Sequence, residues 1–206
     1  MQSYTSILRQ AYNKYILRFG KCQIQTPYRI NLPYQEDRRK YGKSNPRELK
    51  NNVIQMAKEE QLDINQMSCE QIRDFMIKNK LGIDCSGFSY HIINYLLKKV
   101  KQTNLQEIGF PKASLTNVKR FLSRKLTYKI YSYKQLQPGD FVIQIKEQNL
   151  EKPHMLVVLK KYKHKVVLIH SSYYNNPAGV GILKLSQKNL LRNDPAYIFR
   201  RLILLK

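Results

Sequence analysis

Cys85 is the residue of this chain whose type and surroundings best suit covalent chemistry. It lies in the run GIDCSGF at residues 82–88, where a loop is expected to pass into a helix. The first amides of a helix are unpaired and its dipole is positive there, which favours thiolate over thiol. The small residues Ser86 and Gly87 leave room for a substrate. Because a cysteine at a helix start is more often an ordinary packed residue, a nucleophile also requires a base.

Two of the four histidines are candidates for that base. His154 and His170 lie at the edges of adjacent predicted strands, and hairpin pairing would bring their side chains to the same face. One imidazole would take the thiol proton and later protonate the leaving amine, while the other would hold it in the right tautomer. His164, in the run KKYKHK, is expected to be solvated. His91 lies off the helical face of Cys85 and is expected to be structural.

The other two cysteines, Cys22 and Cys69, complete an odd number. The spacings match neither a zinc site nor a disulfide framework, so at least one thiol is free if the others pair. No metal and no cofactor are expected.

Helical patterns dominate the first half of the chain. Apolar residues recur at three and four positions over residues 4–19, and Gly20 follows where a helix would stop. Capping boxes predict helices from Asn45 to about residue 61 and from Ser68 to near Gly82. A further helix is expected to begin at Cys85, and residues 21–44 are expected to be extended and partly exposed.

Strand patterns dominate the second half. The segments FVIQI, MLVVL, VVLIH, GILKL and YIFRRLIL are rich in β-branched or aromatic residues and closely spaced. Short connections favour an antiparallel sheet, and helices gathered before strands predict an α+β fold. The 206 residues are expected to form a single domain. We divide it into a helical N-terminal part with an insertion (1–82) and a core (83–206).

The charge balance is extreme, with 37 Lys and Arg against 14 Asp and Glu and a formal net charge of +23. Such a surface attracts polyanions, which include nucleic acid, anionic lipid and an acidic cell-wall polymer. No apolar run is long enough to span a membrane. No signal peptide is visible at the N-terminus, which by itself indicates a cytoplasmic protein.

Several of these segments together resemble the NlpC family of papain-like cysteine peptidases, which are bacterial cell-wall enzymes. The resemblance rests on DCSGF at 84–88, LQPGDFV at 136–142, the His154 strand and VLIHSS at 167–172. The segments YIFRRL at 197–202 and Thr26-Pro27-Tyr28 are also similar to family elements. The family order of Cys, His and a third polar residue corresponds here to Cys85, His154 and His170.

The resemblance implies a papain-like core, in which the nucleophile helix packs on an antiparallel sheet, with extra N-terminal helices. Cys85 would attack an amide carbonyl, His154 would act as base and then acid, and His170 would orient His154. The Cys85 amide and the Tyr28 hydroxyl would stabilise the oxyanion. Asp84 and Ser86 would bind the free amine of a peptidoglycan stem peptide.

The chain departs from the family pattern in two places. An insertion of about two helices separates Tyr28 from Cys85, and Arg29, Ile30 and Asn31 replace the usual glycines after Pro-Tyr. Met155-Leu156 follows His154 where a small residue is common. A reshaped substrate groove is therefore expected.

The leading functional hypothesis is hydrolysis of a peptidoglycan stem peptide or muropeptide at the γ-D-glutamyl to diamino-acid bond. A second hypothesis keeps the fold and thiol but makes the protein an amidase or acyltransferase. A third is a non-catalytic module that binds a polyanion through its basic surface. A wall substrate lies outside the cytoplasm, so the chain would then act in the cell envelope or after secretion.

Overall fold

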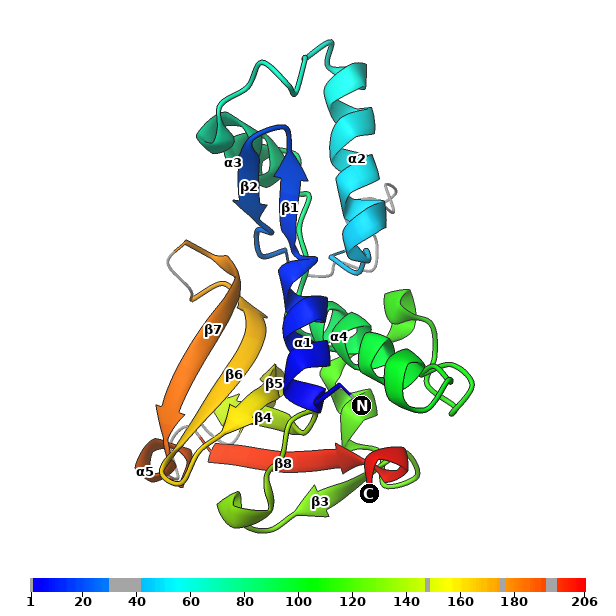
Figure 1. Ribbon diagram of the computed structural model, residues 1–206, viewed down its shortest axis with the longest axis vertical. Coiled ribbons are helices and arrows are strands. Elements are labelled where there is room, and N and C mark those ends of the chain that lie inside the picture. The colour runs from blue at the N-terminus through cyan, green and yellow to red at the C-terminus, as the bar shows by residue number, and fades with distance from the viewer. Residues whose placement is uncertain (1, 30–41, 147–148, 175–176, 192–195) are drawn as a thin grey trace.

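Helices predominate in the first half of the chain, which also contains one hairpin, and strands predominate in the second, as Figure 1 shows. The computed structural model describes residues 2–29, 42–146, 149–174, 177–191 and 196–206. All strand pairs among them are antiparallel except one isolated bridge, Tyr28 to Ile83. The predicted α+β class with an antiparallel sheet is confirmed.

The N-terminal segment forms a helix and a hairpin instead of the single helix predicted over 4–19. Helix α1 (Tyr4–Asn13) ends well before Phe19. The chain continues as β1 (Ile16–Phe19), which pairs with β2 (Cys22–Gln25). Gly20 has a φ of +54°, so it makes the hairpin turn and does not stop a helix. The prediction was wrong here because the pairing with β2 overrides a helical periodicity that short apolar segments can imitate.

The capped helices begin where the sequence predicts. At the start of α2 (Pro46–Glu59) the side chain of Asn45 accepts hydrogen bonds from the N–H groups of Arg47 and Glu48 as part of a capping box. At the start of α3 (Cys69–Lys78) Ser68 and Gln71 form a second capping box. Helix α4 (Cys85–Val100) begins at the expected residue. Helix α3 ends at Lys78, earlier than the predicted end near Gly82.

The main sheet runs in the order β3-β8-β4-β5-β6-β7. Each predicted strand segment corresponds to one of the strands β4 to β8, whereas β3 was not predicted. The sheet strands, with short helix α5, are β3 (Thr127–Ile130), β4 (Phe141–Lys146), β5 (Asn149–Lys161), β6 (Lys165–Ser172), β7 (Gly179–Ser186), α5 (Gln187–Leu190) and β8 (Ala196–Leu202). Short 3-10 turns lie at Ala113–Leu115, Val118–Leu122, Tyr133–Gln135 and Ile203–Leu205.

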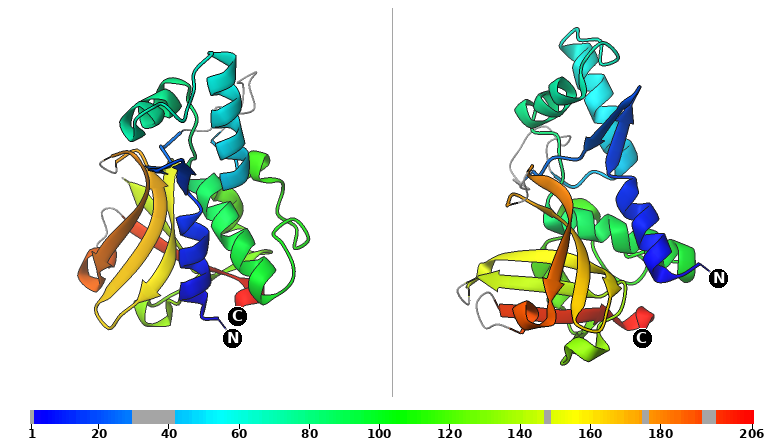
Figure 2. Two further views of the ribbon diagram at one scale, coloured as in Figure 1. Left: turned by 45° about the horizontal axis from the view of Figure 1, so that its top comes forward. Right: turned by 60° about the vertical axis from the view of Figure 1, so that its left-hand side comes forward.

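Helices α1 and α4 pack together against one face of the sheet, as both views in Figure 2 show. Leu8 of α1 and Phe88 of α4 are fully buried with Val157 of β5 in this main core. Helix α1 therefore packs with the 83–206 part, although in sequence it belongs to residues 1–82. The opposite face of the sheet has its own apolar cluster, which includes Leu156 and Leu168.

The hairpin β1–β2 and helices α2 and α3 form an upper lobe in Figure 1 with a separate apolar cluster. Leu49, Val53 and Ile72 are fully buried there. A disulfide joins Cys22 of β2 to Cys69 of α3, with Cα atoms 5.1 Å apart, and Cys85 is the free cysteine. The three cysteines therefore form one disulfide and leave one free thiol.

The segment between β2 and α2, expected to be extended and partly exposed, is buried where it reaches α4. Lys43 is 5% exposed. Most of the charged run in this segment falls in residues 30–41, which lie outside the described residues. No helix in the described parts of the chain is long and apolar enough to cross a membrane.

Candidate active site

Cys85 is the first residue of α4, and the local sequence explains why the helix begins there. The side chain of Asp84 is the N-cap and accepts the Gly87 N–H at 2.6 Å. A carboxylate at this position satisfies an otherwise unpaired amide and interacts favourably with the helix dipole. The loop-to-helix passage predicted at Cys85 is confirmed.

Gly87 is required by a close approach of another segment to this first helical turn. A Cβ at position 87 would lie 2.7 Å from the Gly42 carbonyl oxygen and 3.0 Å from the Cδ atom of Lys43. The Gly42 carbonyl in turn accepts the Asp84 N–H at 2.9 Å. Gly87 therefore makes room for residues 42 and 43, which fill the space that the sequence suggested for a substrate.

The environment of the thiol differs from the one expected at a helix start. Cys85 is 8% exposed, and burial, followed by the Asp84 charge, raises the pKa of its thiol to about 12. Hydrogen bonds from the Met155 and Ser86 N–H groups and the Lys43 charge act in the opposite direction but are smaller. The prediction of a thiolate at rest was wrong, because desolvation outweighs the helix dipole. A neutral thiol needs a base to become a nucleophile.

His154 and His170 come together as the hairpin geometry predicts. Strands β5 and β6 pair antiparallel, and Nε2 of His154 lies 2.9 Å from Nδ1 of His170. The Cys85 thiol accepts a hydrogen bond from the backbone of Met155, the residue next to His154. The structure therefore places Cys85, His154 and His170 in one corner of the fold.

His170 is the buried member of the histidine pair. It is 5% exposed, and burial lowers its pKa to about 4. At neutral pH it is therefore an uncharged imidazole, and its Nδ1 can accept a hydrogen bond from Nε2–H of His154. That hydrogen bond would leave Nδ1 as the basic nitrogen of His154.

Tyr28 lies beside the same corner despite its distance along the chain. It forms an isolated parallel bridge with Ile83, and its neighbour Pro27 bridges Gly179. Burial, followed by the charges of Cys85 and Asp84, raises the pKa of the Tyr28 phenol above its usual range. The hydroxyl is thus a protonated hydrogen-bond donor near Cys85. Tyr28 reaches this corner because it follows closely after β2, although α2 and α3 come between it and Cys85 in the chain.

Asp84 and Ser86, the expected ligands of a substrate amine, already contact an ammonium group of the chain. Nζ of Lys43 lies 2.9 Å from Oδ1 and 2.8 Å from Oδ2 of Asp84, and it donates to Oγ of Ser86. Sequence reasoning missed Lys43, because a charged run such as EDRRKYGK ordinarily marks a solvated segment. Only the adjacent Gly42 hinted at a close backbone approach.

The remaining histidines behave as expected. Nε2 of His91 lies 2.7 Å from the Lys43 carbonyl oxygen, and this contact holds the Lys43 segment against α4. Burial lowers the pKa of His91. His164 is exposed in the turn between β5 and β6. Among the residues that the structure describes, no three His, Cys, Asp or Glu side chains are grouped to hold a metal ion.

Comparison with known proteins returns no match. No family model fits the chain, and neither a curated protein nor a solved structure is significantly similar to it. Assignment of a function therefore depends on the site itself.

Proposed function

We propose that this protein is a cysteine hydrolase of amide bonds with a papain-like core of the NlpC type. One observation carries the proposal. The free thiol at the start of α4 lies against the backbone of β5 beside His154, whose ring pairs with a neutral, buried His170 at 2.9 Å. A nucleophile, a base and a group that orients the base are the parts that thiol catalysis needs.

The reaction begins with a neutral thiol. Nδ1 of His154 removes the Cys85 proton as the sulfur attacks the substrate carbonyl carbon, so that a C–S bond forms and the carbonyl oxygen becomes an oxyanion. The Cys85 backbone N–H and the Tyr28 hydroxyl donate hydrogen bonds to that oxygen. Because burial keeps Tyr28 protonated, it serves as a donor across the neutral pH range.

The imidazolium of His154 then protonates the leaving amine, and the C–N bond breaks to leave a thioester on Cys85. Water enters, His154 takes one of its protons, and the hydroxide attacks the thioester carbonyl. The C–S bond breaks, the acid departs, and the thiol recovers its proton from His154. His170 holds the His154 ring through both halves of the cycle and is a positioning residue.

For the substrate we propose a peptidoglycan stem peptide, cut between γ-D-glutamate and the diamino acid. This choice follows the resemblance to cell-wall peptidases at residues 84–88, 136–142 and 167–172. An amidase or acyltransferase of the same fold is the alternative, and the contact of Lys43 with Asp84 and Ser86 is the observation that favours it.

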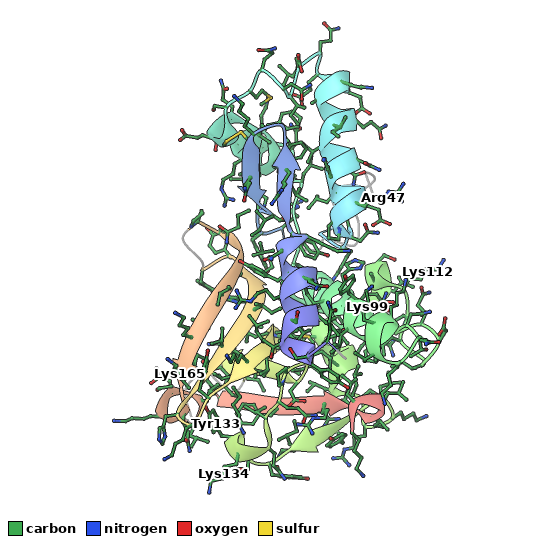
Figure 3. All side chains as sticks on the ribbon, in the orientation of Figure 1. Arg47, Lys99, Lys112, Tyr133, Lys134 and Lys165 are labelled. Carbon is green, nitrogen blue, oxygen red and sulfur yellow. A yellow bond between two sulfur atoms is a disulfide. The ribbon has the colours of Figure 1, made fainter. Side chains whose placement is uncertain are left out.

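The basic surface supports attachment to an anionic polymer. At the lower end of the molecule, Figure 3 shows Tyr133, Lys134 and Lys165 close together. The Lys161 ammonium lies over the Tyr133 ring, and those of Lys160 and Lys165 over the Tyr162 ring. We propose that these residues hold wall polymer by charge, so that added salt releases the protein from sacculi but leaves cleavage of a small muropeptide unchanged. Salt-sensitive nucleic-acid binding without any hydrolysis would instead favour the non-catalytic module.

The proposed activity is tested by mass spectrometry of defined muropeptides incubated with the protein. Cys85→Ala and His154→Ala are each expected to lower turnover by a factor on the order of 10³ or more, because they remove the nucleophile and its base. His170→Gln should keep partial activity, since an amide can still accept from His154. His164→Ala is the matched control and should behave like the wild type. Equal loss in His164→Ala and His154→Ala would contradict the assignment.

A further inference from the structure

The group of Lys43, Asp84 and Ser86 lies next to the nucleophile and has no part in the proton transfers above. The side chain of Lys43 is 4% exposed and that of Asp84 is 10% exposed. The three N–H donors of an ammonium match three acceptor atoms here, namely the two Asp84 carboxylate oxygens and Oγ of Ser86. Ser86 and the Gly87 N–H also donate to Oδ1 of Asp84. The carboxylate is therefore already well supplied with donors.

Lys43 is held in this position by its backbone and its neighbours. The His91 ring bonds the Lys43 carbonyl oxygen at 2.7 Å, and the Tyr15 hydroxyl donates to the next carbonyl, that of Ser44, at 3.4 Å. The lack of a side chain at Gly87 leaves the space that the Lys43 stem occupies. Lys43 is thus a built part of the site and differs from the solvated lysines of the surface.

We infer, on the basis of the proposed function, that Lys43 is a resident ammonium that fills the amine-binding position beside Cys85. The carboxylate of Asp84 and the hydroxyl of Ser86 could bind the free amine of a substrate, but here they bind the Lys43 ammonium. A second ammonium arriving at the same place would meet a like charge and find no acceptor. The substrate class is accordingly an acyl group without a free amine, such as a stem peptide whose N-terminus is still amide-linked.

The experiment compares two synthetic peptides that contain the γ-D-glutamyl bond, one with a free N-terminus and one N-acetylated. The wild type is expected to cleave the acetylated peptide with a kcat/KM at least about tenfold higher, because like charges at hydrogen-bonding distance repel. Lys43→Ala should reverse the preference, since it frees Asp84 for the peptide's own amine. Lys78→Ala, at an exposed lysine paired with Glu60, is the matched control and should keep the wild-type preference.

Two further measurements guard against loss of folding and against failure of the proposed reaction. The double variant Lys43→Met, Asp84→Asn removes both charges and should cleave the two peptides equally. Ethylammonium chloride should raise the melting temperature of Lys43→Ala more than sodium chloride at the same ionic strength does, with no such difference for the wild type or Lys78→Ala.

The inference is overturned if the wild type prefers the free amine, or if folded Lys43→Ala shows neither a changed preference nor stabilisation by ethylammonium. If ethylammonium stabilises Lys43→Ala but the wild type cleaves neither peptide, the proposed reaction is contradicted and the ammonium site is still supported.

Discussion

Two buried ion pairs hold the starts of two elements in this fold, and they use different cations. At the start of α4, Asp84 pairs with Lys43 beside Cys85. At the start of β4, Asp140 of the PGD turn pairs with Arg201 of β8 through two hydrogen bonds of 2.6 and 2.9 Å. Arg201 also donates to the Gln135 carbonyl oxygen and the Tyr128 hydroxyl.

The Arg201 guanidinium and the Lys43 ammonium differ in how close they lie to groups that could react. The planar fork of Arg201 joins the turn, β8 and the segment before β4, so the PGD turn and the last strand are linked by one ion pair. The Lys43 ammonium is a compact charge that contacts Asp84 and Ser86 next to the nucleophile and lowers the pKa of the Cys85 thiol against the effect of burial. We interpret the Asp140–Arg201 pair as structural and the Asp84–Lys43 pair as part of the proposed substrate site.

Loss of one partner of the structural pair should have the largest effect on stability. Asp140→Ala is expected to lower the free energy of unfolding by about 3–5 kcal/mol, because it leaves Arg201 without its partner in a mostly buried position. Urea unfolding measures this loss. A loss below about 1 kcal/mol would show that the Arg201 pair contributes little and would remove the contrast with Lys43.

Stability should also depend on pH through His170. The unfolded imidazole takes up a proton near its ordinary pKa of 6.5, whereas the folded one does so only near about 4. Between these values the unfolded state binds more protons, so the free energy of unfolding falls as the pH is lowered. It falls by about 3 kcal/mol in all, and this contribution is fully present above pH 6.5.

Denaturant titrations between pH 4 and 7 measure this slope. His170→Gln should show a shallower slope, and the buried His91, common to both proteins, cancels from the difference. Identical slopes would mean that His170 is not held neutral by burial.

Removal of both charges of a buried pair should have a similar effect on stability for the two pairs, but a different effect on activity. Asp140→Asn with Arg201→Met, and Asp84→Asn with Lys43→Met, are each expected to change the free energy of unfolding by less than about 2 kcal/mol, because desolvation offsets much of the attraction in a buried pair. Only the second double variant should lose discrimination between free and acetylated peptides. Loss of discrimination in both would contradict the division of roles.

The exposed pair of Lys78 and Glu60 should have the smallest effect. Its atoms are 3.7 Å apart and the Lys78 side chain is 77% exposed. Lys78→Ala is expected to change the free energy of unfolding by less than about 0.5 kcal/mol, since solvent and salt screen such pairs. A larger change in urea unfolding would mean that exposed cations of this highly charged chain are coupled.

Local patterns in the sequence were enough to predict several elements. The capping residues Asn45 and Ser68 and the β-rich segments from β4 to β8 depend on neighbours within a few residues, so their helices and strands follow from local physics. The meeting of His154 and His170 was also predictable, because adjacent antiparallel strands bring such residues together. The α+β class follows from the same patterns.

Tertiary structure alone decided the features that depend on distant residues. The helical periodicity of residues 4–19 gives way to a hairpin because β2 pairs with β1, and the Cys22–Cys69 disulfide needs α3 beside that hairpin. Lys43 becomes buried because Gly42 and Gly87 allow two backbones to approach closely. The raised pKa of Cys85 has the same origin: a local motif specifies the helix start and its dipole, but only packing determines how much water remains around the thiol.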